Sequence, residues 1–202
     1  MNLFKKIILK IKKPKVIIVT EDDKSIIRSV FSIINSHFKV RILEGRLSVL
    51  DLISGEVILI NSSLEDLKLY DFLLENSQKS VLLFAGINQE YYKGNFKDLS
   101  GFDLLLFNSD SVNISNFEKE EFSEVYGFGF NKKSDFQATD MKINSNTNFK
   151  LNYQGSIIPF WLEGRKEKKD VYSVLAGSSL GKILGLNLVS ISEEMKGINI
   201  DK

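Results

Sequence analysis

The sequence predicts an α/β fold in which a mostly parallel sheet is flanked by helices, with a small antiparallel β-sheet near the C-terminus. Short apolar runs recur in the first half without alternating with polar residues, as is typical of strands covered on both faces. Segments of helical spacing separate these runs, and strands that alternate with helices favour a parallel sheet. Beyond residue 124, strand-like segments follow one another across short turns, which indicates antiparallel pairing.

Length and composition predict one soluble globular domain over residues 15–202, preceded by a basic lead-in segment over residues 1–14. The 202 residues carry a net charge of only +1, so the overall charge does not favour nucleic acid as a partner. The chain has no cysteine, which excludes disulfides, thiolate metal sites and a cysteine nucleophile.

The first fifteen residues concentrate positive charge, with six lysines and no acidic residue, whereas the remainder carries 21 basic against 26 acidic residues. An apolar stripe runs between the lysines (Leu3, Phe4, Ile7, Ile8 and Ile11). One interpretation is a helix that packs on the domain. The other is an interfacial helix that makes weak contact with an anionic membrane surface. In both cases Pro14 ends the segment.

The first half divides into strands and helical segments. Residues 16–20 form a strand, and apolar residues at helical spacing predict a helix over residues 24–34. Further buried strands are predicted at residues 56–60, 80–84 and 103–107, with a helical or turn segment at 63–76.

The second half reads as β structure followed by helices. Strands are predicted after residue 124 and at residues 136–143, 147–153 and 156–162. A helix over residues 169–184 is expected to end at Gly185. Ser190 and Glu193 have the spacing of a capping box, which predicts the start of a last short helix at Ser190.

The strand–turn–helix at residues 13–34 has the layout of a phosphate-binding loop from which the glycines are missing. Lys24 and Ser25 open the helix, but Glu21, Asp22 and Asp23 stand where phosphates would bind. A carboxylate ~4 Å from a phosphate charge costs about 4 kcal/mol at an effective dielectric constant near 20. We expect Asp22 and Asp23 to cap the helix instead.

Several segments, taken in order, resemble the central domain of the Mur ligases, the ATP-dependent amide ligases of peptidoglycan synthesis. They are the unit at 13–34, Tyr126-Gly127, Ala138–Ile143, Asn148–Leu151, Lys169–Gly177 and Leu184–Ile191. The likeness spans residues 13–198 and is greatest to the branch that adds D-alanyl-D-alanine. It implies a P-loop-NTPase-like sheet.

The resemblance also identifies candidate nucleotide-binding residues. The family's loop reads T-G-(S/T)-x-G-K-T, so Lys24 and Ser25 match its lysine and its magnesium-binding hydroxyl. Ser173 falls at the end of the segment that matches the family's adenine-side H-N-x-x-N motif.

Other family positions differ. Asn61-Ser62-Ser63 replaces the magnesium-binding glutamate, residues 86–92 lack the family's histidine, and the carbamylated lysine has no counterpart. We therefore expect no catalytic residue and no metal site. Asn108-Ser109-Asp110 resembles a structural turn of the family, and His37, the only histidine, is expected to have a structural role.

These observations favour a non-catalytic Mur-ligase-like protein, a pseudoenzyme with a binding or scaffolding role in cell-wall synthesis. The resemblance implies N-terminal and C-terminal domains as well, which we do not expect to fit within these 202 residues. We expect that the protein needs no cofactor and that it binds an unidentified protein partner, such as a cell-wall enzyme. We also expect a cytoplasmic location, with contact to the inner face of the membrane through residues 1–15. Exposed strand edges and Trp161 are candidate contact features.

Three alternatives stay open. In the first, the protein is a residual nucleotide-binding domain that uses Lys24, Ser25 and Ser173 to hold ATP and magnesium. In the second, it is one subunit of a split ATP-dependent amide ligase. The third alternative is an α/β domain unrelated to the family.

Overall fold

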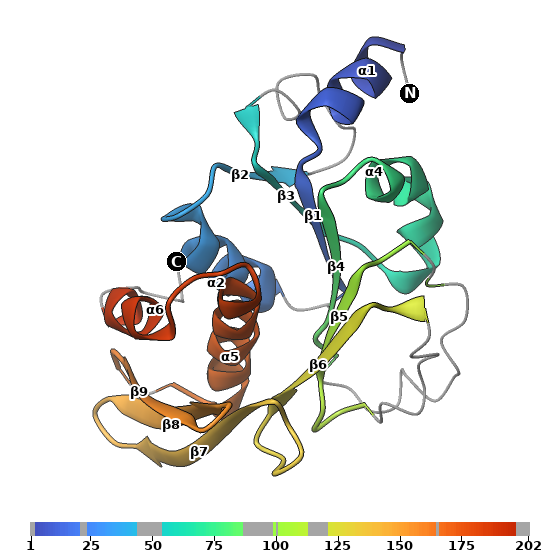
Figure 1. Ribbon diagram of the computed structural model, residues 1–202. Coiled ribbons are helices and arrows are strands. Elements are labelled where there is room, and N and C mark those ends of the chain that lie inside the picture. Colours follow the sequence, from blue (N-terminus) through green and yellow to red (C-terminus); the bar gives the residue numbers. More distant parts are fainter. Residues whose placement is uncertain are drawn as a thin grey trace.

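The computed structural model describes residues 3–20, 24–43, 54–86, 99, 101–112, 121–164 and 166–196. These residues form a nine-stranded sheet with the strand order β2-β3-β1-β4-β5-β6-β7-β8-β9 (Figure 1). The strands are Lys15–Thr20 (β1), Val40–Leu43 (β2), Val57–Asn61 (β3), Lys79–Phe84 (β4), Leu104–Asn108 (β5), Glu124–Gly129 (β6), Phe136–Ile143 (β7), Thr147–Tyr153 (β8) and Ser156–Leu162 (β9). The helices are Leu3–Lys12 (α1), Lys24–Asn35 (α2), Leu64–Tyr70 (η1, a 3-10 helix), Asp71–Glu75 (α4), Lys168–Ile183 (α5) and Leu188–Met195 (α6).

The strands from β2 to β7 pair in parallel, and their side chains fill two cores on opposite faces of the sheet. In β1, Ile17 and Val19 belong to the core under α2 and α5, whereas Val16 and Ile18 belong to the core that includes Leu73 and Leu74 of α4. Because successive side chains of a strand point to opposite faces, a strand buried on both faces is apolar throughout. The predicted mostly parallel sheet is confirmed.

The strands β7, β8 and β9 pair antiparallel and form the small antiparallel part of the sheet that the sequence predicts. Phe149 and Leu151 of β8 are buried while Lys150 between them is exposed, so this end of the sheet is covered on one face. Figure 1 shows α5 and α6 on that covered face. The hydroxyl of Ser192 in α6 donates a hydrogen bond to the carbonyl oxygen of Pro159 in β9.

The lead-in segment is helical, and α1 ends at Lys12, two residues before Pro14. Leu9 is fully buried in the core that also contains Leu73 and Leu74, whereas Ile7 and Ile11 are exposed. One side of α1 therefore packs on the domain while part of its apolar stripe stays in solvent. None of the helices in the described part of the chain has the length and hydrophobicity to cross a membrane.

The segment at 63–76 is helical, as predicted, with a 3-10 helix followed by one turn of α-helix. Two other local features differ from the predictions. The short strand β2, in which Arg41 and Ile42 are exposed between two buried residues, was not predicted. The predicted capping box at Ser190 is wrong, because α6 already begins at Leu188 and the side chain of Asn187 accepts the hydrogen bond from Val189 N–H.

Candidate functional site at the carboxyl edge of the parallel strands

The parallel strands end together at one edge of the sheet, the place where open α/β sheets bind ligands. Thr20, Asn61, Phe84 and Asn108 end β1, β3, β4 and β5. Thr20 and Asn108 are almost completely buried. Asn108 Nδ2 donates to the carbonyl oxygen of Ala85 over 3.4 Å, so this amide links neighbouring strands.

Two of the three candidate nucleotide-binding residues lie in contact. Ser25 Oγ, in the first turn of α2, is 3.1 Å from Ser173 Oγ in α5. Ser173 also donates a hydrogen bond to the carbonyl oxygen of Lys169 over 3.2 Å. A hydroxyl has one proton to donate, so Ser25 is the donor of the pair. Ser173 has no solvent-exposed surface.

The contact between these two serines is the end of a longer helix–helix interface, which we call the α2–α5 seam. Along α2 it comprises Ser25, Ser29 and Ile33, and along α5 it comprises Ser173, Gly177 and Gly181, with steps of four residues on both helices. A Cβ atom on Gly177 would lie 2.6 Å from Ile33 Cδ1 and 3.2 Å from the carbonyl oxygen of Ser29. The two helices therefore approach so closely that a side chain at position 177 would force Ile33 and the Ser29 carbonyl to shift.

The remaining loop predictions fall on residues that the structure leaves undescribed. Lys24 is the first residue of α2, but its side chain is not described. Glu21, Asp22 and Asp23 lie outside the described residues. The capping of α2 by Asp22 and Asp23 therefore stays a prediction. Residues 87–92, where the family's histidine is missing from the sequence, also lie outside the described residues.

The two residues after β3, Ser62 and Ser63, are polar but uncharged. Ser62 N–H donates to the carbonyl oxygen of Val19, and Ser63 Oγ donates to Asp66 Oδ2 over 2.9 Å. Among the described residues no three histidine, aspartate or glutamate side chains cluster in a way that could hold a metal ion. At the end of β3 the described residues thus present amide and hydroxyl groups.

The turn after β5 is held by the carboxylate of Asp110. Its Oδ2 accepts hydrogen bonds from Phe130 N–H (2.6 Å) and Tyr172 Oη (2.8 Å), and its Oδ1 accepts one from Asn131 N–H (2.8 Å). A Cβ atom on Gly129 would lie 2.8 Å from Asp110 Oδ2, and this glycine has a φ of +155°. These contacts agree with the structural turn expected at residues 108–110.

The partner of Asp110 was not predicted from the sequence. Tyr172 lies in the helix predicted over residues 169–184, but nothing in the sequence connected its hydroxyl to the turn. Burial, and then the hydrogen bond to Asp110, raise the pKa of the Tyr172 phenol above its usual value. The phenol thus stays protonated and donates to the carboxylate. The sequence signals that could have predicted this contact are an acidic residue in a turn, Asp110, and a tyrosine on an apolar helix, Tyr172, whose buried hydroxyl needs a partner.

His37 has the structural role that the sequence predicts. Its Nε2 lies 3.0 Å from Glu194 Oε1, and Ser36 Oγ donates to the other oxygen of the same carboxylate over 2.9 Å. The contacts of Ser36 and His37 with Glu194 link the end of α2 to α6.

With this geometry in view, comparison with solved structures identifies the fold. A MurF ligase from Thermotoga maritima in complex with ADP superimposes with a TM-score of 0.70, at 11% sequence identity, over 97% of this chain and 52% of that one. MurF from Acinetobacter baumannii gives a TM-score of 0.64 at 12% identity, over 98% and 50% of the two chains. The chain has the fold of the Mur ligases.

The likeness extends to other members of that group. A UDP-N-acetylmuramoyl-L-alanyl-D-glutamate–2,6-diaminopimelate ligase gives a TM-score of 0.65 at 9% identity, over 96% and 51% of the two chains. No family model and no curated protein matches the sequence. The chain spans about half the length of these ligases, and the resemblance inferred from the sequence motifs is confirmed for the fold.

Proposed function

We propose that this protein is a non-catalytic, Mur-ligase-like protein that acts in cell-wall synthesis by binding or scaffolding rather than by ATP-dependent ligation. The observation that carries the proposal is the complete burial of Ser173 in its contact with Ser25. A nucleotide can reach this hydroxyl only if α2 and α5 separate. At Gly177 the same seam is so tight that a single added methyl group would meet α2.

The chemistry of the loop supports the same conclusion. Between the end of β1 at Thr20 and the start of α2 at Lys24, the chain has three acidic residues and no glycine. Phosphate-binding loops need backbone N–H groups that face the ligand, and glycine permits this close approach. Three carboxylates would instead repel the phosphate oxygens.

Metal binding is disfavoured for a similar reason. Magnesium in nucleotide sites is held by carboxylates together with phosphate oxygens. The described segment after β3 offers Asn61, Ser62 and Ser63, and the hydroxyl of Ser63 is engaged by Asp66. Without a metal ion near the phosphates, the transfer of a phosphoryl group would lose its main source of charge stabilisation.

The second candidate function is residual nucleotide binding. The observation in its favour is that Ser25 and Ser173, far apart in sequence, do meet beside the first turn of α2. In this case Lys24 would contact phosphate, and binding would require the seam to open.

Isothermal titration of the full chain with ATP and magnesium at millimolar concentration separates the two functions. We expect no saturable heat that depends on Lys24, so wild type and Lys24→Ala should behave alike. Saturable binding that is lost in Lys24→Ala would overturn the proposal and establish the second function.

A further inference from the structure

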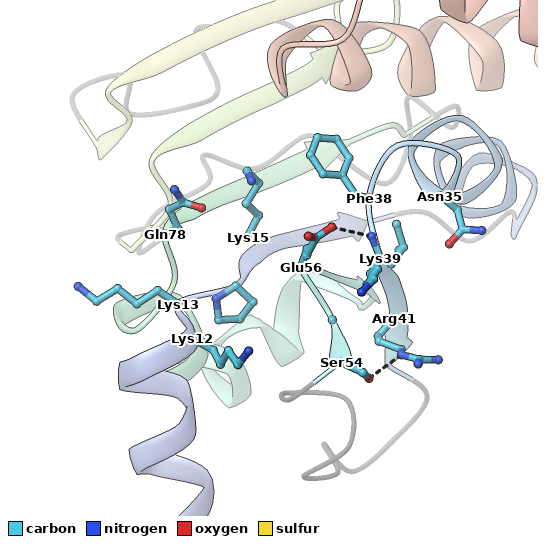
Figure 2. Close-up of a pocket in the computed structure, with 13 residues that line it drawn as sticks. Lys12, Lys13, Lys15, Asn35, Phe38, Lys39, Arg41, Ser54, Glu56 and Gln78 are labelled. Carbon is cyan, nitrogen blue, oxygen red and sulfur yellow. Dashed lines mark hydrogen bonds between the residues drawn. The ribbon is translucent and has the colours of Figure 1, made fainter.

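A cavity of about 800 Å³ lies at the amino ends of the parallel strands, away from the candidate nucleotide-binding residues. It lies where α1 ends and where β1, β2 and β3 begin, and Figure 2 shows its lining side chains grouped around these strand starts. Its volume is in the range of small-molecule sites, which is roughly 300–1,000 Å³. The candidate nucleotide edge is at the other end of the same strands.

The lining of this cavity is strongly basic. Five cationic residues line it, Lys12, Lys13, Lys15, Lys39 and Arg41, and Glu56 is the only acid among its described lining residues. No ion pair among the described residues involves any of the five. The carboxyl ends of α1 and α2 add about half a negative charge each, which offsets only part of this excess. We refer to this feature as the basic cavity.

Several contacts hold the basic cavity in shape. Glu56 Oε2 accepts a hydrogen bond from the backbone N–H of Lys39 over 2.9 Å, and Arg41 Nε donates to Ser54 Oγ over 3.0 Å (Figure 2). The ammonium group of Lys15 lies 5.1 Å from the centre of the Phe38 ring. The one carboxylate therefore fixes the backbone, and the lysine is positioned by a cation–π contact rather than by an acid.

The backbone of Lys13 adds an independent sign of constraint. This residue has a φ of +43°, in the left-handed region that favours glycine, and it follows directly after α1. Residues other than glycine rarely adopt this conformation, which the turn between α1 and β1 imposes here. With Lys12 and Lys15, this lysine completes a group of three cations that one short segment brings to the cavity.

We propose that the basic cavity binds the phosphate groups of a ligand that carries two or more negative charges. Gathering five cations around a single described acid is unfavourable in the empty state, and a polyanion would relieve this repulsion. The phosphate groups could belong to a soluble molecule or to a membrane lipid. A membrane lipid would also gain contacts from α1, because Ile7 and Ile11 of this helix are 48% and 75% exposed and its last residue, Lys12, lines the cavity.

The test uses the full chain and two probes at low salt. Inorganic pyrophosphate is titrated calorimetrically, and cosedimentation is measured with phosphatidylglycerol and with phosphatidylcholine vesicles. The cavity variant is Lys12→Ala with Lys15→Ala. The control, Lys132→Ala with Lys133→Ala, removes the same charge from the exposed turn after β6.

We expect binding to weaken about tenfold or more in the cavity variant and to change little in the control. Lys12→Arg with Lys15→Arg should bind like wild type, and Glu56→Gln should bind more tightly because it keeps the acceptor and removes the negative charge. Lys24→Ala should leave binding unchanged, which separates this site from the candidate nucleotide edge.

The two probes distinguish the source of the phosphate. Binding of pyrophosphate without vesicles indicates a soluble ligand, and binding of phosphatidylglycerol vesicles that is lost in the cavity variant indicates a lipid. If neither probe binds, or if the control variant weakens binding as much as the cavity variant does, the proposal is wrong.

Discussion

The phenol of Tyr172 in α5 donates a hydrogen bond to the carboxylate of Asp110 in the turn after β5, over 2.8 Å. These residues are 62 positions apart in the chain. Because the same carboxylate also accepts from Phe130 N–H and Asn131 N–H, three segments of the fold meet at one side chain. The turn at residues 108–110 is therefore part of the scaffold. Its contribution to the free energy of unfolding can be measured.

Replacing Tyr172 with phenylalanine should lower the free energy of unfolding by about 1–2 kcal/mol, because it removes a hydrogen bond to a charged acceptor. Asp110 keeps two backbone donors, so the loss should stay moderate. Urea melts at neutral pH measure it. Tyr153→Phe is the matched control, since its ring stacks on Phe136 and should keep that contact. An equal loss in both variants would contradict the role of the hydrogen bond.

Stability should also fall at alkaline pH because of Tyr172. Burial and the hydrogen bond to Asp110 raise the pKa of this phenol, while a tyrosine in the unfolded chain titrates near 10. Above about pH 10 the unfolded state therefore binds fewer protons than the folded state, and the free energy of unfolding decreases as pH rises.

The measurement is a series of urea melts from about pH 8.5 to about pH 11. Tyr126, whose pKa is raised by burial and then by Glu124, adds a similar slope that Tyr172→Phe retains. The alkaline slope should be shallower in Tyr172→Phe than in wild type. Identical slopes would mean that Tyr172 does not keep its proton.

The α2–α5 seam predicts that Gly177→Ala destabilises the protein, although alanine favours helices. The new methyl group meets Ile33 Cδ1 and the Ser29 carbonyl oxygen, and overpacking of this kind costs about 1–3 kcal/mol. Ile33→Val removes the atom that clashes and costs about 0.5–1.5 kcal/mol alone.

A double-mutant cycle checks this pair by denaturant melts. The double variant should be more stable than the sum of the two single effects predicts. Strict additivity would mean that the methyl group added at position 177 does not meet Ile33, and it would contradict the tight seam.

The acidic loop provides a prediction that rests on sequence alone. Replacing Asp22 and Asp23 with glycine should lower the free energy of unfolding by about 0.5–2 kcal/mol, because acidic N-caps stabilise a helix. The change nominally restores the family's glycines, but we expect no nucleotide binding. Melts with and without ATP and magnesium measure both effects, and stabilisation by nucleotide would mean that the acids block a surviving site.

The sequence predicted the sheet well because its signal is local. A strand covered on both faces is apolar at every position, as in Val16–Val19, and no tertiary information is needed to recognise it. The ends of α1 and α5 were also predicted from local signals. Pro14 has a fixed φ that ends α1, and Gly185 adopts a φ of +98° just after α5.

What the sequence could not predict depends on distant partners. The short strand β2 has two exposed residues and is defined by its pairing with β3. The basic cavity combines lysines near residue 12 with Lys39, Arg41 and Glu56, which only the sheet brings together. The hydroxyl contact between Ser25 and Ser173 likewise joins two residues 148 positions apart.

The two cores have a consequence for synthesis of the chain. The buried residues of the core that contains Leu73 extend only from Leu9 to Phe122, whereas the core under α2 includes residues up to Met195. A nascent chain that has produced β1 to β6 therefore has one apolar sheet face with no α5 to cover it. Exposed sheet surface of this kind is prone to aggregation, so a ribosome-bound intermediate of this protein should be a substrate for chaperones until the last helices emerge.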